Sequence, residues 1–222
     1  MNWDWSSAIM AFFVTVSIFL IGFLVSEEYN AYKVSSIKDD YRGLFEDMES
    51  LQLEEMYLEQ KNSSSCSLRE YQLEQLSGRL NDVMKRLVAY QNAREFSSEF
   101  FNLKRDYTLL QLRAWILTRS IQKECDLDVI SVLYFFDLTT CPSCEEQGYV
   151  LDFYRREVGH KLMVFSVDRE LSLPIMGMIT TDYNVSSAPV LIINGKKHDG
   201  LVNKDQMKEI LCEEYSEKPG FC

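Results

Sequence analysis

The chain has 222 residues, of which 46% are hydrophobic and 26% charged, proportions typical of a folded protein rather than a disordered one. Its formal net charge of -11 argues against nucleic acid as a partner, because the chain has no excess of cations to neutralise phosphates. Only two histidines, His160 and His198, are present, so a histidine-rich zinc site is hard to build, and we expect neither a metal nor another cofactor.

Residues 8–25 form an apolar run without a charged side chain. As a helix they would nearly span the hydrocarbon core of a bilayer, and Trp3 and Trp5 precede them, where aromatic rings favour the interface. A cleaved signal peptide needs a basic start and a small-residue cleavage site, and the sequence has neither. We therefore expect an uncleaved, single-pass anchor over residues 1–27 that contacts the lipid bilayer.

The side of the membrane is indicated by two conflicting signals. Lys33, Lys38 and Arg42 follow the apolar run and no basic residue precedes it, which by the positive-inside rule places the rest of the chain in the cytoplasm. Six cysteines and the sequons at Asn62 and Asn184 favour an oxidising compartment instead. We expect an extracytoplasmic body and keep the cytoplasmic orientation as the alternative.

Residues 28–125 are expected to be helical, because they contain no proline and only two glycines. Apolar residues recur at alternating steps of three and four over 37–58, 73–90 and 100–121, with polar breaks near 62–66 and 96–98. This predicts three antiparallel helices packed as a stalk or small bundle. A coiled-coil homodimer through the same segment is the alternative.

Two cysteines lie at the ends of these predicted helices. In an antiparallel arrangement, the loop at Cys66 and the end of the third helix at Cys125 come to the same end of the bundle. A Cys66–Cys125 disulfide is therefore expected to clamp the helices to the next domain. Two free, partly buried thiols are the alternative.

The pattern changes at residue 129, where an apolar run of β-forming residues, 129–136, predicts a buried central strand. Cys141-Pro142-Ser143-Cys144 follows after a short turn, and residues 145–156 are typical of a helix. The unpaired N–H groups and the dipole of a helix N-terminus stabilise a thiolate. Cys141 is therefore the predicted nucleophile, and Cys144 is the thiol that resolves the mixed disulfide.

The remaining elements follow in the order β-α-β-α-β-β-α. A strand over 161–167 and a helix over 170–181 precede Ala188-Pro189, which leads into a strand that an Asn194-Gly195 turn closes, and a last helix covers 203–214.

With these motifs, residues 126–215 resemble the thioredoxin superfamily. The resemblance implies that Pro189 is cis and lies against the C-x-x-C, and that Ala188 and Pro189 offer their backbone to a substrate peptide. The expected fold is thus an α/β thioredoxin-like domain, preceded by a transmembrane helix and a helical segment and followed by a tail over 216–222.

The sequence also departs from the thioredoxin pattern. Thr140 replaces the tryptophan before the first cysteine, and Phe135 stands where the family has a buried aspartate, with Asp137 two residues on. Proton transfer at Cys144 thus lacks the buried carboxylate that usually assists it in the family. Glu145 and Glu146 oppose thiolate formation at Cys141, which predicts a more reducing poise than the motif alone.

With Cys141 and Cys144 as one pair, the simplest pairing of the other four cysteines adds Cys212–Cys222 to Cys66–Cys125. The Cys212–Cys222 bridge would pin the tail to the last helix. The alternative is a redox relay from the C-x-x-C to a tail cysteine.

Two functions are compatible with these features. The first is a membrane-anchored thiol–disulfide oxidoreductase acting on protein dithiols and disulfides or on a membrane redox partner. A zinc site is disfavoured because no second C-x-x-C is present. The alternative function is a redox-inactive scaffold whose helices bind a partner, because a fold does not guarantee its chemistry.

Overall fold

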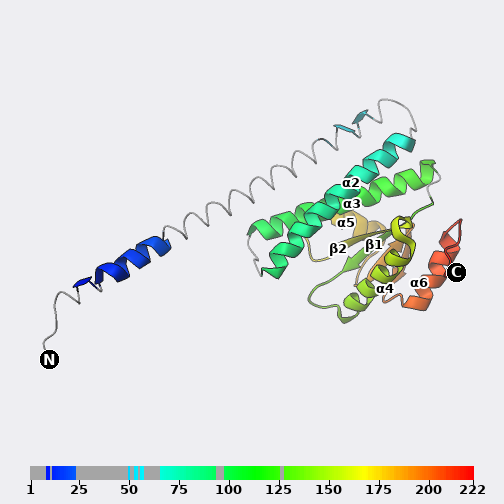
Figure 1. The fold of residues 1–222 in the computed structure, drawn as a ribbon. Coiled ribbons are helices and arrows are strands. Elements are labelled where there is room, and N and C mark those ends of the chain that lie inside the picture. Colours follow the sequence, from blue (N-terminus) through cyan, green and yellow to red (C-terminus); the bar gives the residue numbers. More distant parts are fainter. Residues whose placement is uncertain are drawn as a thin grey trace. The chain divides into compact units, whose positions relative to one another are not determined.

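The computed structural model describes residues 9–10, 12–23, 50, 53–54, 56–57, 66–93, 98–125 and 128–222. The chain divides into two compact units, Met1–Glu54 and Glu55–Cys222 (Figure 1). Most of the apolar repeat expected over 37–58 and part of the expected membrane span, including residues 11, 24 and 25, lie outside the described residues.

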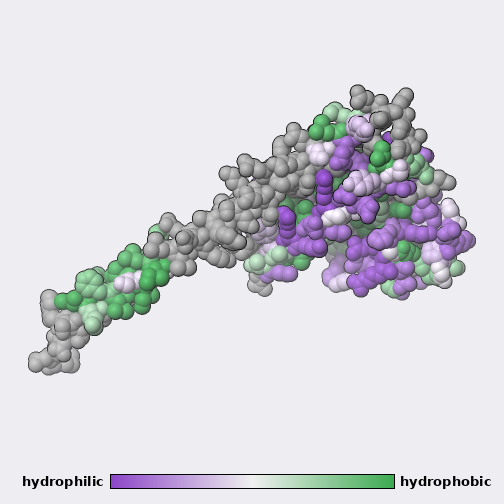
Figure 2. Space-filling model, turned by 45° about the horizontal axis from the view of Figure 1, so that its top comes forward, coloured by the Kyte–Doolittle hydropathy of each residue, from purple (hydrophilic) through white to green (hydrophobic). Residues whose placement is uncertain are grey.

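In the first unit, residues 9–10 and 12–23 are helical. Their large apolar side chains are exposed, among them Phe12 and Phe19, and this helix is the most continuously hydrophobic surface in view (Figure 2). Across the ranges that the structure describes, no helix is both long enough and apolar enough to cross a membrane.

Two long helices begin the second unit. Helix α2 (Cys66–Asn92) and helix α3 (Ser98–Cys125) run antiparallel, and a Cys66–Cys125 disulfide joins the start of one to the end of the other (Figure 1). The buried apolar side chains of α2 are spaced three, seven and four apart: Leu73, Leu76, Val83 and Leu87. This spacing confirms the predicted helix face, because it is the one that buries a single stripe of a helix.

Helix α3 is buried on more than one side, since it contacts α2 and also strands β1 (Ile130–Phe136) and β2 (Leu162–Asp168). Against β2, the side chain of Gln111 accepts a hydrogen bond from the Ser166 amide at 2.6 Å. Lys104 pairs with Asp168 at 2.5 Å. The helical pair and the sheet therefore belong to one compact unit, with α3 between them.

The sheet has four strands in the order β2-β1-β3-β4. Strand β1 is parallel to β2 and antiparallel to β3 (Val190–Ile193), and β3 is antiparallel to β4 (Lys196–Asp199). The β3–β4 turn has positive φ at Asn194 (46°) and Gly195 (83°), as a two-residue hairpin turn requires.

The other helices are α4 (Pro142–Val158), α5 (Pro174–Asp182) and α6 (Lys204–Glu214), with a 3-10 turn at Gly159–Lys161. The β-α-β-α-β-β-α order predicted from the sequence is confirmed. Helix α5 begins at Pro174 rather than at residue 170, because proline is tolerated at the first helical position and disrupts later ones.

The helices cover both faces of the sheet. Helices α4 and α6 lie on one face, where Leu151 and Met207 join a core cluster with Val132 and Tyr134 of β1. Helices α3 and α5 lie on the opposite side (Figure 1). Strand β1 is thus buried on both faces, and its C-terminal end is the place from which the chain leaves toward Cys141.

We expect the Cys66–Cys125 disulfide to be a major source of stability. Its residues are 59 apart in sequence, and closing a loop of this length stabilises a protein by about 2–4 kcal/mol. The double variant Cys66→Ser/Cys125→Ser should lose about this much free energy of unfolding in urea, measured without reductant so that the other disulfides stay intact. The variant Cys212→Ser/Cys222→Ser should lose less free energy of unfolding, because its disulfide joins residues only 10 apart in sequence. An unchanged midpoint for the first variant would contradict the prediction.

Candidate redox site

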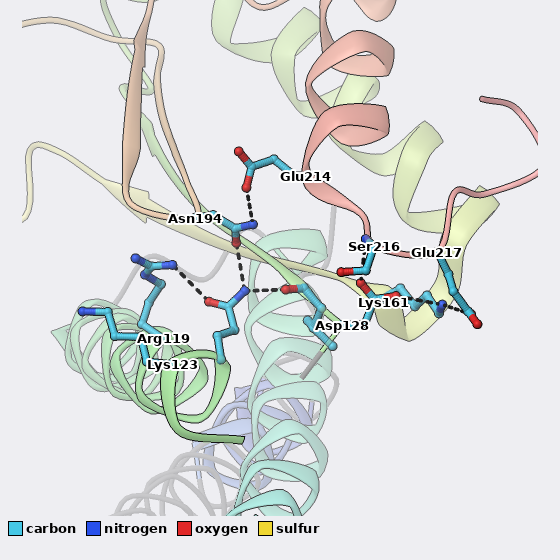
Figure 3. Close-up of a pocket in the computed structure, with 10 residues that line it drawn as sticks. Arg119, Lys123, Asp128, Lys161, Asn194, Glu214, Ser216 and Glu217 are labelled. Carbon is cyan, nitrogen blue, oxygen red and sulfur yellow. Dashed lines mark hydrogen bonds and ion pairs between the residues drawn. The ribbon is translucent and has the colours of Figure 1, made fainter. Parts of the chain in front are cut away.

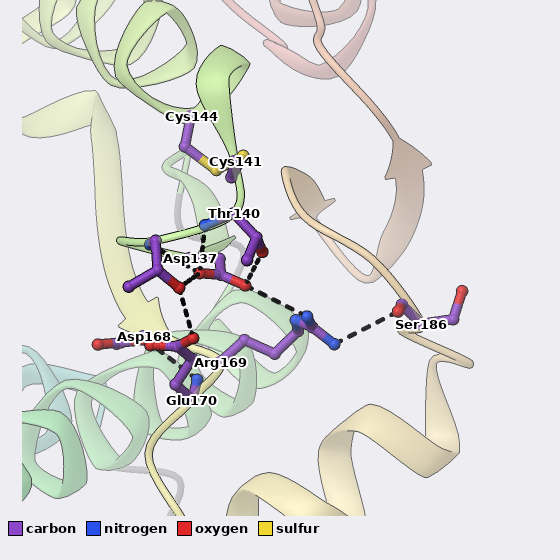
Figure 4. Close-up of polar contacts among 9 residues, drawn as sticks. Asp137, Thr140, Cys141, Cys144, Asp168, Arg169, Glu170 and Ser186 are labelled. Carbon is purple, nitrogen blue, oxygen red and sulfur yellow. Dashed lines mark hydrogen bonds and ion pairs between the residues drawn. A yellow bond between two sulfur atoms is a disulfide. The ribbon is translucent and has the colours of Figure 1, made fainter.

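Cys141 lies at the start of α4 and is disulfide-bonded to Cys144 (Figure 4). Cys141 occupies the N-cap position, with no side-chain hydrogen bond to the helix, and Pro142 follows at the first helical position. Pro142 has no N–H, and the Cys144 amide donates to the Cys141 carbonyl at 3.2 Å, so the helix dipole is the feature of this N-terminus that favours a thiolate at Cys141. Cys144 is 7% exposed, whereas Cys141 is only partly buried. An incoming sulfur thus reaches Cys141 more easily than Cys144.

The peptide bond between Ala188 and Pro189 is cis, the geometry that the thioredoxin resemblance implies. Val190 pairs with Phe135, so Pro189 comes level with the C-terminal end of β1. Cys141 and Ala188 both pack against the core cluster on the α4 and α6 face. The fold thus brings the cysteine pair and the cis proline to the same end of the sheet.

Asp137 organises the loop between β1 and Cys141. Its carboxylate, 4% exposed, accepts hydrogen bonds from the amides of Thr139 at 2.9 Å and Thr140 at 3.1 Å. The two threonine hydroxyls also donate to it, at 3.1 and 2.6 Å. These bonds, led by the Thr140 hydroxyl and the Thr139 amide, hold the pKa of Asp137 well below its usual range, although burial opposes them. The loop is therefore wrapped around a permanent negative charge.

Asp137 does not replace the buried aspartate that the sequence lacks at Phe135. A carboxylate with so low a pKa is a poor proton acceptor. Its partners are Arg169 and the threonines, whereas Cys144 packs in the core cluster beside Tyr134. The Tyr134 hydroxyl donates to the Cys144 carbonyl at 2.6 Å, and burial raises the pKa of Tyr134 to about 12, so the donor stays protonated.

Sequence reasoning missed Arg169, which follows β2. Its Nη2 atom lies 3.3 Å from an Asp137 carboxylate oxygen, and its Nη1 atom donates to the Ser186 carbonyl at 3.3 Å (Figure 4). A single arginine after a strand has no distinctive pattern, so no sequence signal marks it. The Asp-x-Thr-Thr run was a readable signal, since aspartate side chains commonly bond to amides two or three residues on.

Glu145 and Glu146 in the first turns of α4 are both exposed. Glu145 accepts a hydrogen bond from the Tyr149 hydroxyl at 2.9 Å. Solvent around the two carboxylates screens their repulsion of a Cys141 thiolate. The more reducing potential of the Cys141–Cys144 pair that these two charges are expected to cause stays a prediction.

The other two disulfides lie away from this site. Asn194 donates its amide to the Ser131 carbonyl, near the start of β1, and its side chain donates to Glu214, two residues after Cys212. Strand β1 has seven residues, so roughly 20 Å separates that end of the sheet from the Cys141 end. A relay between Cys212 or Cys222 and the C-x-x-C does not fit this arrangement.

A polar cavity of about 540 Å³ opens at this second end of the sheet (Figure 3). Three of its charged groups pair with one another, Lys161 with Asp128 at 3.2 Å and with Glu217 at 3.4 Å, and Glu214 accepts a hydrogen bond from Asn194 at 2.8 Å. No cysteine is among its described lining residues. Among the described ranges as a whole, no three His, Cys, Asp or Glu side chains are grouped as metal ligands would be. The redox site and this cavity are therefore separate.

The low pKa of Asp137 makes a prediction about acid. A carboxylate whose pKa is lower in the folded than in the unfolded state stabilises the fold above the unfolded-state value, about 3.9, and this stabilisation is lost as the pH falls below it. Asp137→Asn should therefore unfold at lower urea than wild type at pH 7, and the difference should shrink below about pH 4. Asp152→Asn, at an exposed surface pair of α4, should match wild type throughout. A pH-independent difference for Asp137→Asn would contradict the assignment.

The chain is similar to two solved structures. One is described as the structure of a malarial protein: it is 20% identical, and the match covers 40% of this chain and 99% of that one, with a TM-score of 0.33. The other is a thioredoxin-2 of the malaria parasite, described as a component of its protein secretion machinery: it is 21% identical, and the match covers 38% and 82% of the two chains, with a TM-score of 0.33. No protein-family model and no curated protein matches the sequence. The solved structures similar to this chain thus include a thioredoxin, and neither similarity bears on activity.

Proposed function

We propose that the protein is a thiol–disulfide oxidoreductase that exchanges disulfides with protein substrates through Cys141 and Cys144. One observation carries the proposal. An accessible cysteine at a helix N-terminus is bonded to a buried cysteine three residues on, at the sheet end that also holds a cis proline. A purely structural crosslink gains little from this placement, because a bond across three residues closes almost no loop.

The exposure of Cys141 and the burial of Cys144 support the roles proposed for them. A substrate thiolate attacks the sulfur of Cys141, the Cys141–Cys144 bond breaks, and Cys144 leaves as a thiolate that takes up a proton. A second substrate thiolate then attacks the substrate sulfur of the mixed disulfide, and Cys141 leaves. The substrate loses two electrons and two protons, which the cysteine pair gains, and the same steps in reverse reduce a substrate disulfide.

Ala188 and Pro189 are the proposed contact for the substrate backbone. Their position supports this role, because they lead into β3 at the sheet end where Cys141 lies. Ser186 and Ser187, just before them, are exposed.

We also propose that the apolar helix of the first unit anchors the protein in a membrane, with the redox domain outside the cytoplasm. The helix supports this because its described side chains are apolar and exposed to a degree that water does not favour. The three disulfides support the location, because disulfides persist in oxidising compartments.

Insulin reduction by dithiothreitol tests the redox proposal. Wild type should accelerate the reduction, and Cys141→Ser should give the uncatalysed rate, because it lacks the nucleophile. Cys144→Ser should accumulate a mixed disulfide with substrate, visible by mass spectrometry. Cys212→Ser/Cys222→Ser should retain activity, since its disulfide lies at the other end of the sheet. Equal, negligible activity of wild type and Cys141→Ser would favour the scaffold alternative.

Membrane fractionation tests the anchor. Full-length protein should stay in the membrane pellet after an alkaline carbonate wash, whereas deletion of residues 8–25 should release a redox domain that keeps its insulin activity. Labelling of Cys141 by an impermeant maleimide in intact cells, after mild reduction, should report an extracytoplasmic site. Wild type in the soluble fraction would contradict the anchor, and labelling only after lysis would reverse the orientation.

A further inference from the structure

Arg169 lies between the two loops that border the Cys141–Cys144 disulfide (Figure 4). Its backbone amide donates to the Phe136 carbonyl at 2.9 Å, which fixes the residue at the end of the sheet. One guanidinium nitrogen then lies 3.3 Å from Asp137 and another 3.3 Å from the Ser186 carbonyl. A single planar group thus bridges two segments that are about fifty residues apart in the sequence.

Both partners of the bridge lead directly to groups of the proposed site. The Asp137 carboxylate also binds the amides of Thr139 and Thr140, so it controls the chain up to Cys141. Ser186 lies two residues before Ala188 and the cis bond. The guanidinium therefore links the position of the reactive sulfur to the position of the proposed substrate contact.

Folding stability is a poor explanation for this arginine. Its Nε atom is buried and, among the residues that the structure describes, has no hydrogen-bond partner, which is unfavourable for a buried donor. Both of its contacts are longer than the 2.7–2.9 Å, approximately, that is usual for charged hydrogen bonds. The side chain is also 34% exposed, so solvent weakens the ion pair.

We propose that Arg169 is a positioning residue for disulfide exchange, which holds the Cys141 loop and the cis-proline loop at the separation that a substrate chain requires. This inference rests on the proposed function. A peptide disulfide has to lie against both loops for its sulfur to align with Cys141, and misalignment slows such reactions. A small dithiol that contacts only the cysteine pair does not need the spacing.

The test compares two substrates of the full-length protein. Arg169→Gln should raise the KM for a peptide disulfide about tenfold, because glutamine loses the charge and cannot bridge both partners. The rate constant for reduction of the Cys141–Cys144 disulfide by dithiothreitol should stay within about twofold of wild type. Arg156→Gln, which alters an exposed arginine of α4, is the matched control and should change neither quantity.

Arg169→Lys separates bridging from charge. Lysine can keep the ion pair with Asp137 but lacks the planar fork that reaches Ser186 at the same time. It should therefore keep a wild-type melting temperature while the KM is raised as in Arg169→Gln. A wild-type KM for Arg169→Lys would show that charge alone suffices and would overturn the proposal.

Other outcomes are equally decisive. An unchanged KM in folded Arg169→Gln, or an equal loss with both substrates, would overturn the positioning role and leave the proposed function intact. If Arg169→Gln does not fold, the KM of Arg169→Lys decides alone. A folded wild type that exchanges no more disulfide than Cys141→Ser would refute the proposed function, and this inference with it.

Discussion

Strand β1 is hydrogen-bonded on both edges, to β2 and β3, and buried on both faces. Such a strand has no freedom to shift its register, because each side chain already fills a place in one of two cores. The residue that follows its last hydrogen bond is therefore fixed in space. Asp137 and then Cys141 follow this rigid end, so the position of the Cys141 sulfur depends on the burial of the strand.

One charged residue, Asp137, shapes the turn that leads from this apolar strand to the partly buried Cys141. Asp137 is almost completely buried, yet it stays ionised because two amides and two hydroxyls donate hydrogen bonds to its oxygens. A buried carboxylate with fewer donors would be protonated or would force the loop to open. A buried charge is energetically unfavourable, but here it fixes the conformation of residues 137–140. The loop therefore holds the following Cys141 in one orientation.

The disulfide proposed to react and the two other disulfides are separated along the sheet. The Cys141–Cys144 pair lies at the C-terminal end of β1, whereas Cys212–Cys222 lies near the β3–β4 turn, beside Asn194 and Glu214. The Cys66–Cys125 bond closes the α2–α3 pair just before β1 begins. Since thiol–disulfide exchange needs sulfur atoms in contact, this separation allows one pair to react while the others keep the fold closed.

Local pattern in the sequence determined the elements and their order: the apolar run of β1, the C-x-x-C before a helix, the Asn194-Gly195 turn, and the apolar stripe of α2. It also indicated the Cys66–Cys125 pair, because antiparallel helices of similar length bring their opposite ends together. These features depend on residues close in sequence or on simple helix geometry. Only the tertiary structure decided that α3 has a second buried side, since polar Gln111 and Thr118 lie on it and satisfy their hydrogen bonds with backbone atoms of β2 and of α3 itself. The contacts of Arg169 and Tyr134, and the separation of the two ends of the sheet, likewise could not be predicted from the sequence. Hydrogen bonds between residues far apart in the chain leave no periodic pattern in it.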